Sequence, residues 1–160
     1  MLKYVRLLLT CCCLTAFTPC TDCAAAQTVP ETARTDREYE MRNASIRING
    51  REFVFKLYDT PAAREFAARL PLHIVMQDLN GNEKYHYLSR PLPARAQQVG
   101  HIRTGDVMLF GDDCLVVFYQ SFSTSYAYTP LGRIENPAGL TQAAGKNSVT
   151  VHINQVAAKK

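Results

Sequence analysis

Two Asn-Gly dipeptides constrain what this chain can fold into more than any other feature of its 160 residues. The type I′ turn of a two-residue hairpin needs positive φ at both central positions, a conformation that Asn and Gly adopt readily. Asn49-Gly50 interrupts an alternation of apolar and polar residues over 45–58, and Asn80-Gly81 interrupts a similar pattern over 72–88. Each dipeptide therefore predicts an antiparallel β-hairpin. In the second hairpin, a two-residue turn predicts two facing pairs, Met76 with Tyr85 and Ile74 with Tyr87.

A short helix is expected between the two hairpins, over residues 61–70. Thr60 can cap its first turn, Pro61 suits the first helical position, and Pro71 ends it. Apolar residues recur every four positions on one side of this helix: Ala62, Phe66 and Leu70. The pattern is typical of an amphipathic helix packed on a sheet.

The remaining chain contains further short segments of strand type. We expect strands at Asp106–Phe110, Cys114–Phe122, 132–134 and Val149–Ile153, and a second short helix at Pro137–Ala144. The segment Ser121–Thr129 also alternates strictly, so a strand there would carry an aromatic stripe on one face, consisting of Phe122, Tyr126 and Tyr128. Seven or eight short strands with one or two helices predict a mainly β protein with a closed antiparallel barrel.

Residues 1–26 have the pattern of a secretory signal peptide. Lys3 and Arg6 precede an apolar run over 7–17, and Ala24–Ala26 supplies the small residues that a signal peptidase recognises. The apolar run is too short for a permanent membrane anchor, so we expect no transmembrane segment in the mature chain. The domain is therefore predicted to be exported, to the periplasm or the medium. A buried N-terminal helix is one alternative interpretation.

A lipoprotein acylated at Cys20 or Cys23 is the other alternative for the leader. With the leader removed, residues 27–43 are predicted to form a flexible polar segment, and residues 44–155 a single domain.

Five of the six cysteines lie in the leader, which leaves Cys114 alone in the mature chain. Its apolar neighbours predict a buried, inert thiol rather than a nucleophile.

The sequence contains no motif for a cofactor or a metal. The histidines lack paired metal-ligand spacing, and no Gly-rich phosphate loop or Gly-x-Ser-x-Gly occurs. Asp106, Asp112 and Asp113 fit either a cation site or acidic turns. The formal charge of +4 is mild and the basic residues form no run beyond the final Lys pair, so no nucleic-acid partner is expected.

Several segments resemble the barrel of cyclophilins. They are Phe53–Leu70, Gly105–Phe110, Cys114–Tyr119, Leu131–Ala143 and Val149–Ile153. The chain resembles more closely a group of bacterial cyclophilin-like proteins of uncharacterised function, over residues 45–153. The phrases LYDTPAAREFAARLP, DLNGNEKY and SFSTSYAYTPLGRI carry that resemblance.

The resemblance implies a residual apolar pocket. Met108 and Phe118 match the family's pocket floor, and Tyr128 stands where cyclophilins have a pocket histidine, four residues before the Gly. Tyr126 and Tyr128 have hydroxyls that need partners or water, which favours the rim of a site. The predicted ligand-binding residues are therefore Met108, Phe118, Tyr126 and Tyr128, and Phe122 is assigned to the core.

The chain differs from the cyclophilin family at the catalytic motif. Prolyl isomerases of this type have an Arg in a Phe-His-Arg segment, which stabilises the amide as it twists. No Phe-His-Arg occurs here, and Arg90, Arg95 and Arg103 lie near the corresponding loop without forming that motif. The sequence therefore favours a domain that binds a peptide or small molecule and has no assigned catalytic residue. The alternatives are a prolyl isomerase with a rearranged active site and a domain that binds a partner through its surface.

Overall fold

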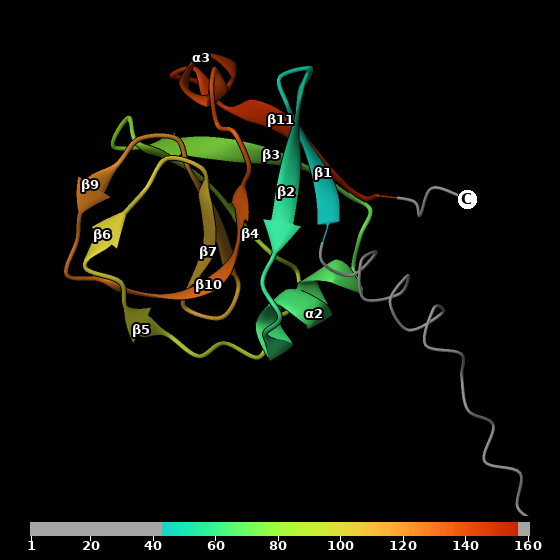
Figure 1. Cartoon of the computed structure of the whole chain (residues 1–160), viewed down its shortest axis with the longest axis vertical. Helices are drawn as coiled ribbons and strands as arrows, with labels where there is room; N and C mark the ends of the chain where they lie inside the picture. The colour runs from blue at the N-terminus through green and yellow to red at the C-terminus, as the bar shows by residue number, and fades with distance from the viewer. Residues whose placement is uncertain (1–42, 157–160) are drawn as a thin grey trace, which may run out of the picture.

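The computed structural model describes residues 43–156, in which eight antiparallel strands close into a barrel (Figure 1). The order around the barrel is β2-β1-β11-β3-β4-β8-β7-β10, and the pairing of β10 with β2 closes it. The strands are β1 (Asn43–Ile48), β2 (Arg51–Leu57), β3 (Leu72–Leu79), β4 (Glu83–Tyr87), β7 (Asp106–Phe110), β8 (Cys114–Phe118), β10 (Ala127–Ile134) and β11 (Val149–Gln155). The predicted closed, mainly β barrel is confirmed.

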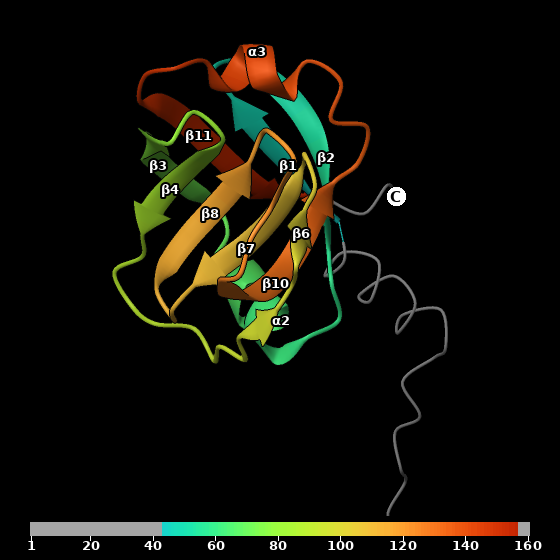
Figure 2. The ribbon, with the colours of Figure 1, turned by 90° about the vertical axis from the view of Figure 1, so that its left-hand side faces the viewer.

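Three short strands lie outside the barrel wall. The strand β5 (Gln97–Gln98) pairs with the start of β10, and β6 (His101–Ile102) pairs with β9 (Phe122–Ser123) as a separate two-stranded sheet. Figure 2 shows β6 in front of β7 and β10. These strands and their loops therefore cover the outer face of the barrel on this side.

The first predicted hairpin is confirmed in detail. Asn49 and Gly50 both have positive φ, at 48° and 80°, and Ile48 pairs directly with Arg51. The turn therefore has two residues, as the dipeptide predicts. Alternate apolar residues of β1 and β2, among them Ile46, Phe53 and Phe55, point into the barrel, where Phe55 is fully buried.

The second hairpin has the predicted Asn-Gly turn but a different register. Two predicted pairs are wrong: Met76 with Tyr85 and Ile74 with Tyr87. Tyr85 pairs with Gln77 instead, because the loop contains three residues, 80–82. One additional loop residue moves every later side chain to the opposite face of the strand. Met76 consequently points into the barrel, whereas Tyr85 lies on its outer face.

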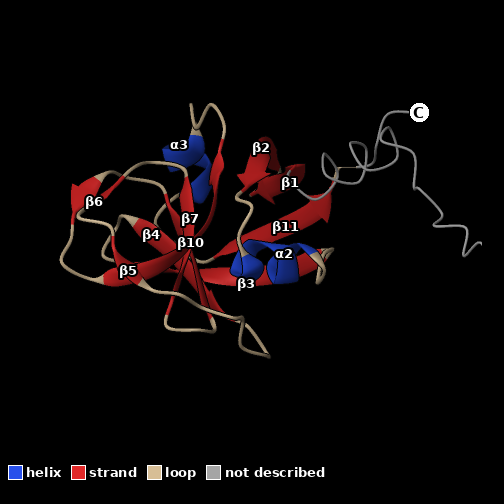
Figure 3. Ribbon diagram, turned by 60° about the horizontal axis from the view of Figure 1, so that its bottom comes forward, coloured by secondary structure: helices blue, strands red, loops and turns tan. Residues whose placement is uncertain are grey.

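Two short helices, α2 (Pro61–Ala67) and α3 (Leu140–Ala144), lie at opposite ends of the barrel (Figures 1 and 3, blue in Figure 3). Thr60 caps α2 as predicted, because its Oγ1 accepts a hydrogen bond from the Ala63 amide at 3.2 Å. The predicted end at Leu70 was three residues too late. After Ala67 the chain forms a tighter turn, in which the Leu70 amide donates a hydrogen bond to the Ala67 carbonyl. In addition, Leu70 precedes Pro71, and a residue before a proline disfavours helical backbone.

The aromatic stripe does not form one strand. The strand β8 ends at Phe118 rather than at the predicted Phe122, and the segment is divided between β9 and β10. Thr124 makes the break: its Oγ1 accepts from the Tyr126 amide at 3.1 Å, and its own amide donates to Gly100. Such a local side-chain hydrogen bond competes with strand pairing. The stripe residues consequently occupy different environments.

Apolar side chains form two separate clusters. The barrel core fills the interior and includes Phe55, Phe66 and Leu131. The second group, which we term the outer cluster, lies between the outer face of the sheet and the segments that cover it: Ile102, Met108, Cys114, Val116, Phe118 and Tyr128, with Tyr85, Val99 and Phe122 packed against them. Because both faces of β8 are covered, all five of its residues are buried. This explains why β8 reads as a continuous apolar run instead of an alternating one.

A β-bulge interrupts the pairing of β10 with β7. Pro130 pairs with Met108 and Gly132 with Val107, which leaves Leu131 as an additional residue. Gly132 lies where β10 meets β2, and a Cβ there would approach the Lys56 carbonyl oxygen to 2.2 Å. Only glycine allows this close approach of the two strands.

The predicted leader, residues 1–26, lies outside the described residues, as does the polar segment 27–43 except for its last residue. Neither helix of the described region is long and apolar enough to cross a membrane.

Candidate functional site

A groove of about 820 Å³ runs along the outer face of β7 and β10, next to the outer cluster. Met108 of β7 and Pro130 of β10, which are register partners, lie in its floor. One wall comes from residues 93–103, the segment that contains β5 and β6, and the other from residues 58–62 at the start of α2. We term this site the β7–β10 groove.

Basic side chains outnumber acidic ones in the groove. Arg95, Arg103 and Arg133 line it, and Asp106 is the carboxylate among its lining residues. Asp106 is buried: its Oδ2 accepts from the Arg103 amide at 2.8 Å, and its Oδ1 lies 3.8 Å from Arg133 Nε. Within residues 43–156, the guanidinium groups of Arg95 and Arg103 form neither a hydrogen bond nor an ion pair.

The loop that carries Arg95 is fixed to the barrel through its backbone. The Arg95 amide donates to Thr129 Oγ1 at 2.9 Å, and Thr129 is a buried residue of β10. Further along the same segment, Ile102 is fully buried in the outer cluster. The groove wall is therefore held at two points, while its basic side chains stay exposed.

The four predicted ligand-binding residues do not lie together in the groove. Met108 lines it, whereas Phe118 and Tyr128 are buried in the outer cluster with ring centroids 5.4 Å apart. Tyr126 is 63% exposed and contacts Phe110. The space over Phe118 is filled by the chain itself, through Ile102 and Phe122.

Burial determines the acid–base properties of the outer cluster. It raises the pKa of Tyr128 to about 12, with nearby Glu83 as a second cause, so the phenol stays protonated. Burial, followed by the charge of Asp113, raises the pKa of Cys114 to about 11. The prediction that Cys114 is buried is confirmed, and such a thiol is a poor nucleophile at neutral pH.

Glu83 is a buried acidic residue outside the groove, and the sequence did not indicate its burial. It directly follows the second turn, where a charged residue is usually exposed, yet it is only 8% exposed on the face of β4 that carries Tyr85. It pairs across the sheet with Phe118, and its carboxylate makes no hydrogen bond or ion pair with the described chain. Burial, and after it the charge of Asp78, raises the pKa of Glu83.

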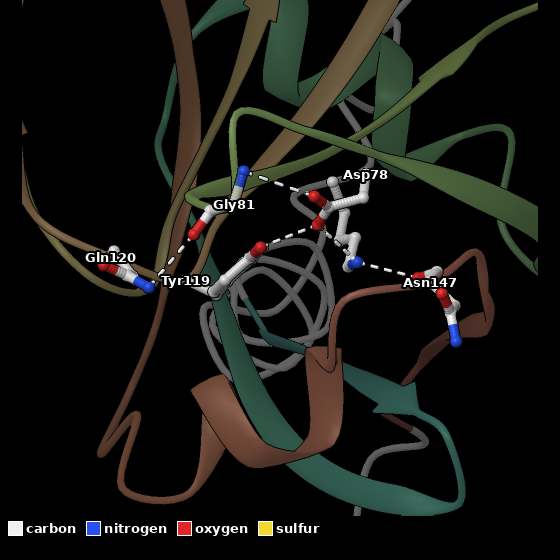
Figure 4. Close-up of polar contacts among 6 residues, drawn as sticks. Asp78, Gly81, Tyr119, Gln120 and Asn147 are labelled. Atoms are coloured by element: carbon white, nitrogen blue, oxygen red, sulfur yellow. Dashed lines mark hydrogen bonds and ion pairs between the residues drawn. The ribbon is translucent and has the colours of Figure 1, made fainter.

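A second buried polar group lies at the end of the barrel near α3 (Figure 4). Lys84 is 1% exposed, and its Nζ donates to Asp78 Oδ1 at 2.6 Å and to the Asn147 carbonyl at 2.8 Å. The Tyr119 hydroxyl donates to the same Asp78 oxygen at 2.6 Å. Partial burial alone would raise the pKa of Asp78, but the hydrogen bonds from Lys84 and Tyr119 outweigh it and lower that pKa.

This Lys84–Asp78–Tyr119 network joins three parts of the barrel. It connects the β3–β4 hairpin with the end of β8 and with the loop before β11. The donors and acceptors that meet here satisfy one another, which is the arrangement of a structural network rather than of a reactive site.

The acidic residues 106, 112 and 113 do not assemble a cation site. Asp106 faces the Arg103 amide and Arg133, and Asp112 and Asp113 lie in the turn between β7 and β8. Across residues 43–156, no three His, Cys, Asp or Glu side chains come together as potential metal ligands.

The closed barrel with two short end helices is the cyclophilin-like fold. The model of the cyclophilin-like family matches residues 46–154, and the protein belongs to this family. Among solved structures, the chain is similar to the solution structure of the hypothetical protein AF2241 from Archaeoglobus fulgidus. The two share 19% sequence identity and a TM-score of 0.50, over 72% of this chain and 95% of that one.

A further similarity is to McbB, whose structure was determined in complex with tryptophan. Here the identity is 15% and the TM-score 0.49, over 70% of this chain and 44% of McbB. No match was found among curated proteins. Similarities at these identities concern the fold alone.

Proposed function

We propose that this protein is an exported cyclophilin-like domain that binds a peptide or a small molecule in the β7–β10 groove, without turnover. The groove itself is the main support, since its volume of about 820 Å³ lies within the 300–1,000 Å³ typical of ligand sites. It combines an apolar floor at Met108 and Pro130 with polar groups on the walls. Such a mixture provides affinity from the floor and orientation from the walls.

The groove differs from the pocket that the sequence suggested. Phe118 and Tyr128 do not line the groove. They belong to the outer cluster together with Met108, which lines the groove as well. A ligand in the groove would therefore contact Met108 directly. Changes at Phe118 or Tyr128 would act on binding through the packing of Met108.

Binding without turnover agrees with the chemistry of the nearby residues. Cys114 is a buried thiol with a raised pKa, and the sequence lacks the Phe-His-Arg segment of the isomerases. No described cluster of ligands could hold a metal. The groove is lined by guanidinium, amide, hydroxyl, imidazole and carboxylate groups, all of which can bind a ligand without reacting with it.

One observation favours the alternative, a prolyl isomerase with a rearranged active site. Arg95, Arg103 and Arg133 share the groove with Met108. An arginine placed against a twisting prolyl amide could stabilise its transition state by a charge-assisted hydrogen bond. Exchange NMR on a proline-containing peptide tests this, and we expect no acceleration of cis–trans exchange. Acceleration that an Arg95→Gln or Arg103→Gln variant removes would assign the isomerase function instead.

The binding proposal is tested by NMR titration of the mature protein with a proline-containing peptide and a fragment set. We expect ligand-dependent shifts at the Met108 methyl and at Val99, which both line the groove. Val54 provides the control, because it is exposed on β2 and does not line the groove. Shifts that are absent from the groove, or that spread equally to Val54, would contradict the proposal.

Export is part of the proposal and rests on residues 1–26 alone. Mass spectrometry of the protein from a native envelope fraction tests it. We expect a chain that begins at Gln27. An intact N-terminus, or a lipid on Cys20 or Cys23, would contradict cleavage at this position.

A further inference from the structure

The positive charge of the β7–β10 groove is not balanced by the protein. Three guanidinium groups face one carboxylate, that of Asp106. Three of the five arginines elsewhere in residues 43–156 are paired with acidic side chains: Arg47 with Glu52, Arg64 with Asp59 and Arg69 with Glu65. Unpaired arginines gathered in a concave site attract an anion from solution.

We infer that the groove binds a ligand through a carboxylate group, held by Arg95 and Arg103 with Arg133 beside them. This inference rests on the proposed function and specifies its ligand class. A guanidinium presents a planar set of N–H donors that matches the two oxygens of a carboxylate. Arg95 and Arg103 have these donors free, because neither guanidinium has a partner within residues 43–156.

Asp106 determines where in the groove an anion binds. Its buried carboxylate lies 3.8 Å from Arg133 Nε, so part of the positive charge is already neutralised at this end of the groove. An anion near Arg133 would be repelled by Asp106, whereas Arg95 and Arg103 have no acidic partner. The carboxylate of the ligand is therefore expected at Arg95 and Arg103.

The rest of the groove indicates what carries the carboxylate. Met108, Pro93 and Pro130 supply apolar surface next to the arginines, and Tyr58 and Gln97 supply neutral hydrogen-bonding groups. The ligand is consequently an organic acid with an apolar body. A small carboxylic acid and a peptide with a free C-terminus share this chemistry.

Isothermal titration of the mature protein with matched acid and amide probes tests the inference. One pair is acetyl-Ala-Ala-Pro-Phe as free acid and as C-terminal amide, and the other is 3-phenylpropionate and its amide. We expect one or both acids to bind at least about tenfold more tightly than their amides, since a hydrogen bond to a charged group contributes roughly 10- to 100-fold. The pair that discriminates identifies the source of the carboxylate. Added salt should weaken binding of the acid.

Variants assign the effect to the groove. Arg95→Gln and Arg103→Gln should each weaken the acid by about tenfold and leave the amide unchanged. Arg47→Gln, on the exposed face of β1 and outside the groove, should change neither. Thermal unfolding of each variant verifies that it is folded.

Three outcomes would overturn the inference. If acid and amide bind equally and both shift the Met108 methyl, the carboxylate specificity is wrong while the binding function stands. If inorganic phosphate displaces the acid at lower concentration than acetate does, the assignment of a carboxylate as the bound group is wrong. If no probe of either pair perturbs the groove, both the inference and the proposed function fail.

Discussion

The barrel core and the outer cluster are built from the same strands but by different means. On β7 and β8, alternate residues such as Val107 and Leu115 point into the barrel, while Met108 and Val116 point outward. The interior is enclosed by long, regularly paired strands. The outer face is enclosed by short strands and irregular loops, including the segment with Ile102. One face of a barrel wall thus becomes a second core only when a loop covers it.

This difference has a consequence for function. The loop segment that buries the outer cluster with Ile102 also forms one wall of the β7–β10 groove. Its apolar residues stabilise the fold, and Arg95 and Arg103 stay exposed. A covering loop that rests on only a few contacts can vary its exposed residues without disturbing the barrel core. The groove is therefore the region of the molecule where specificity can change at least cost in stability.

The largest expected effect compares two fully buried phenylalanines. Phe55→Ala in the barrel core should reduce the free energy of unfolding by about 5 kcal/mol, and Phe118→Ala in the outer cluster by about 3 kcal/mol. The cost of a cavity falls where the surroundings can collapse into it, and the cover over Phe118 is irregular. Urea unfolding of both variants measures the difference. Equal losses would show that the outer cluster is as rigid as the barrel core.

The next largest loss of stability is expected in the Lys84–Asp78–Tyr119 network. Lys84→Met leaves Asp78 without its buried cation, and we expect a loss of about 3 kcal/mol. Lys56→Met is the control, because Lys56 forms an exposed ion pair with Glu135 at 3.5 Å, and such pairs contribute at most about 1 kcal/mol. Similar losses for the two variants in urea would contradict a structural role for the network.

Glu83 should make stability depend on pH. Its folded-state pKa is raised above the ordinary value of 4.5, so ionisation costs stability as the pH rises through the folded pKa. Glu83→Gln should therefore be more stable than the natural protein at neutral pH, and the difference should disappear below pH 4.5. Thermal unfolding over a pH series measures this difference.

Glu52 supplies the control of opposite sign. A hydrogen bond from Arg47 is the largest cause of its lowered pKa, so Glu52→Gln should be slightly less stable at neutral pH and should lose that difference in acid. A Glu83→Gln variant that behaves like Glu52→Gln would mean that the Glu83 carboxylate is stabilised by a partner in the folded protein rather than destabilised by burial.

The smallest effect is expected in the groove. Arg95→Ala should change the free energy of unfolding by less than about 0.5 kcal/mol, because the side chain is exposed and has no partner among the described residues. Thermal unfolding measures this. A loss above about 1 kcal/mol would mean that Arg95 supports the covering loop and is not free to bind a ligand.

Local chemistry explains which features could be predicted from the sequence. Asn49 and Gly50 determine their turn through their own backbone preferences, and Thr60 and Pro61 determine where α2 begins. The register of the second hairpin depended on a third loop residue, Asn82, which no dipeptide rule indicates. The continuous burial of β8 similarly depends on a loop distant in sequence.

The candidate site was less predictable for the same reason. Met108 was identified through the resemblance, but the groove also requires Arg95 and Arg103 from one loop and Arg133 from β10. These residues meet only after the barrel closes. No sequence pattern indicates that Lys84 is buried, because its burial depends on Asp78 and on the loop before β11.

The bulge at Leu131 links the closure of the barrel to the chemistry of its outer face. Pro130 and Arg133 are three positions apart, an odd spacing that would direct them to opposite sides of a regular strand, yet both line the groove. Deleting Leu131 would restore a regular strand in which Pro130 and Arg133 are two positions apart and still on one face, but the barrel core would lose a fully buried leucine. The bulge therefore adds an apolar side chain to the interior without moving the arginine out of the groove. A relative with one residue fewer here would keep its arginine in the site and have a less completely filled core.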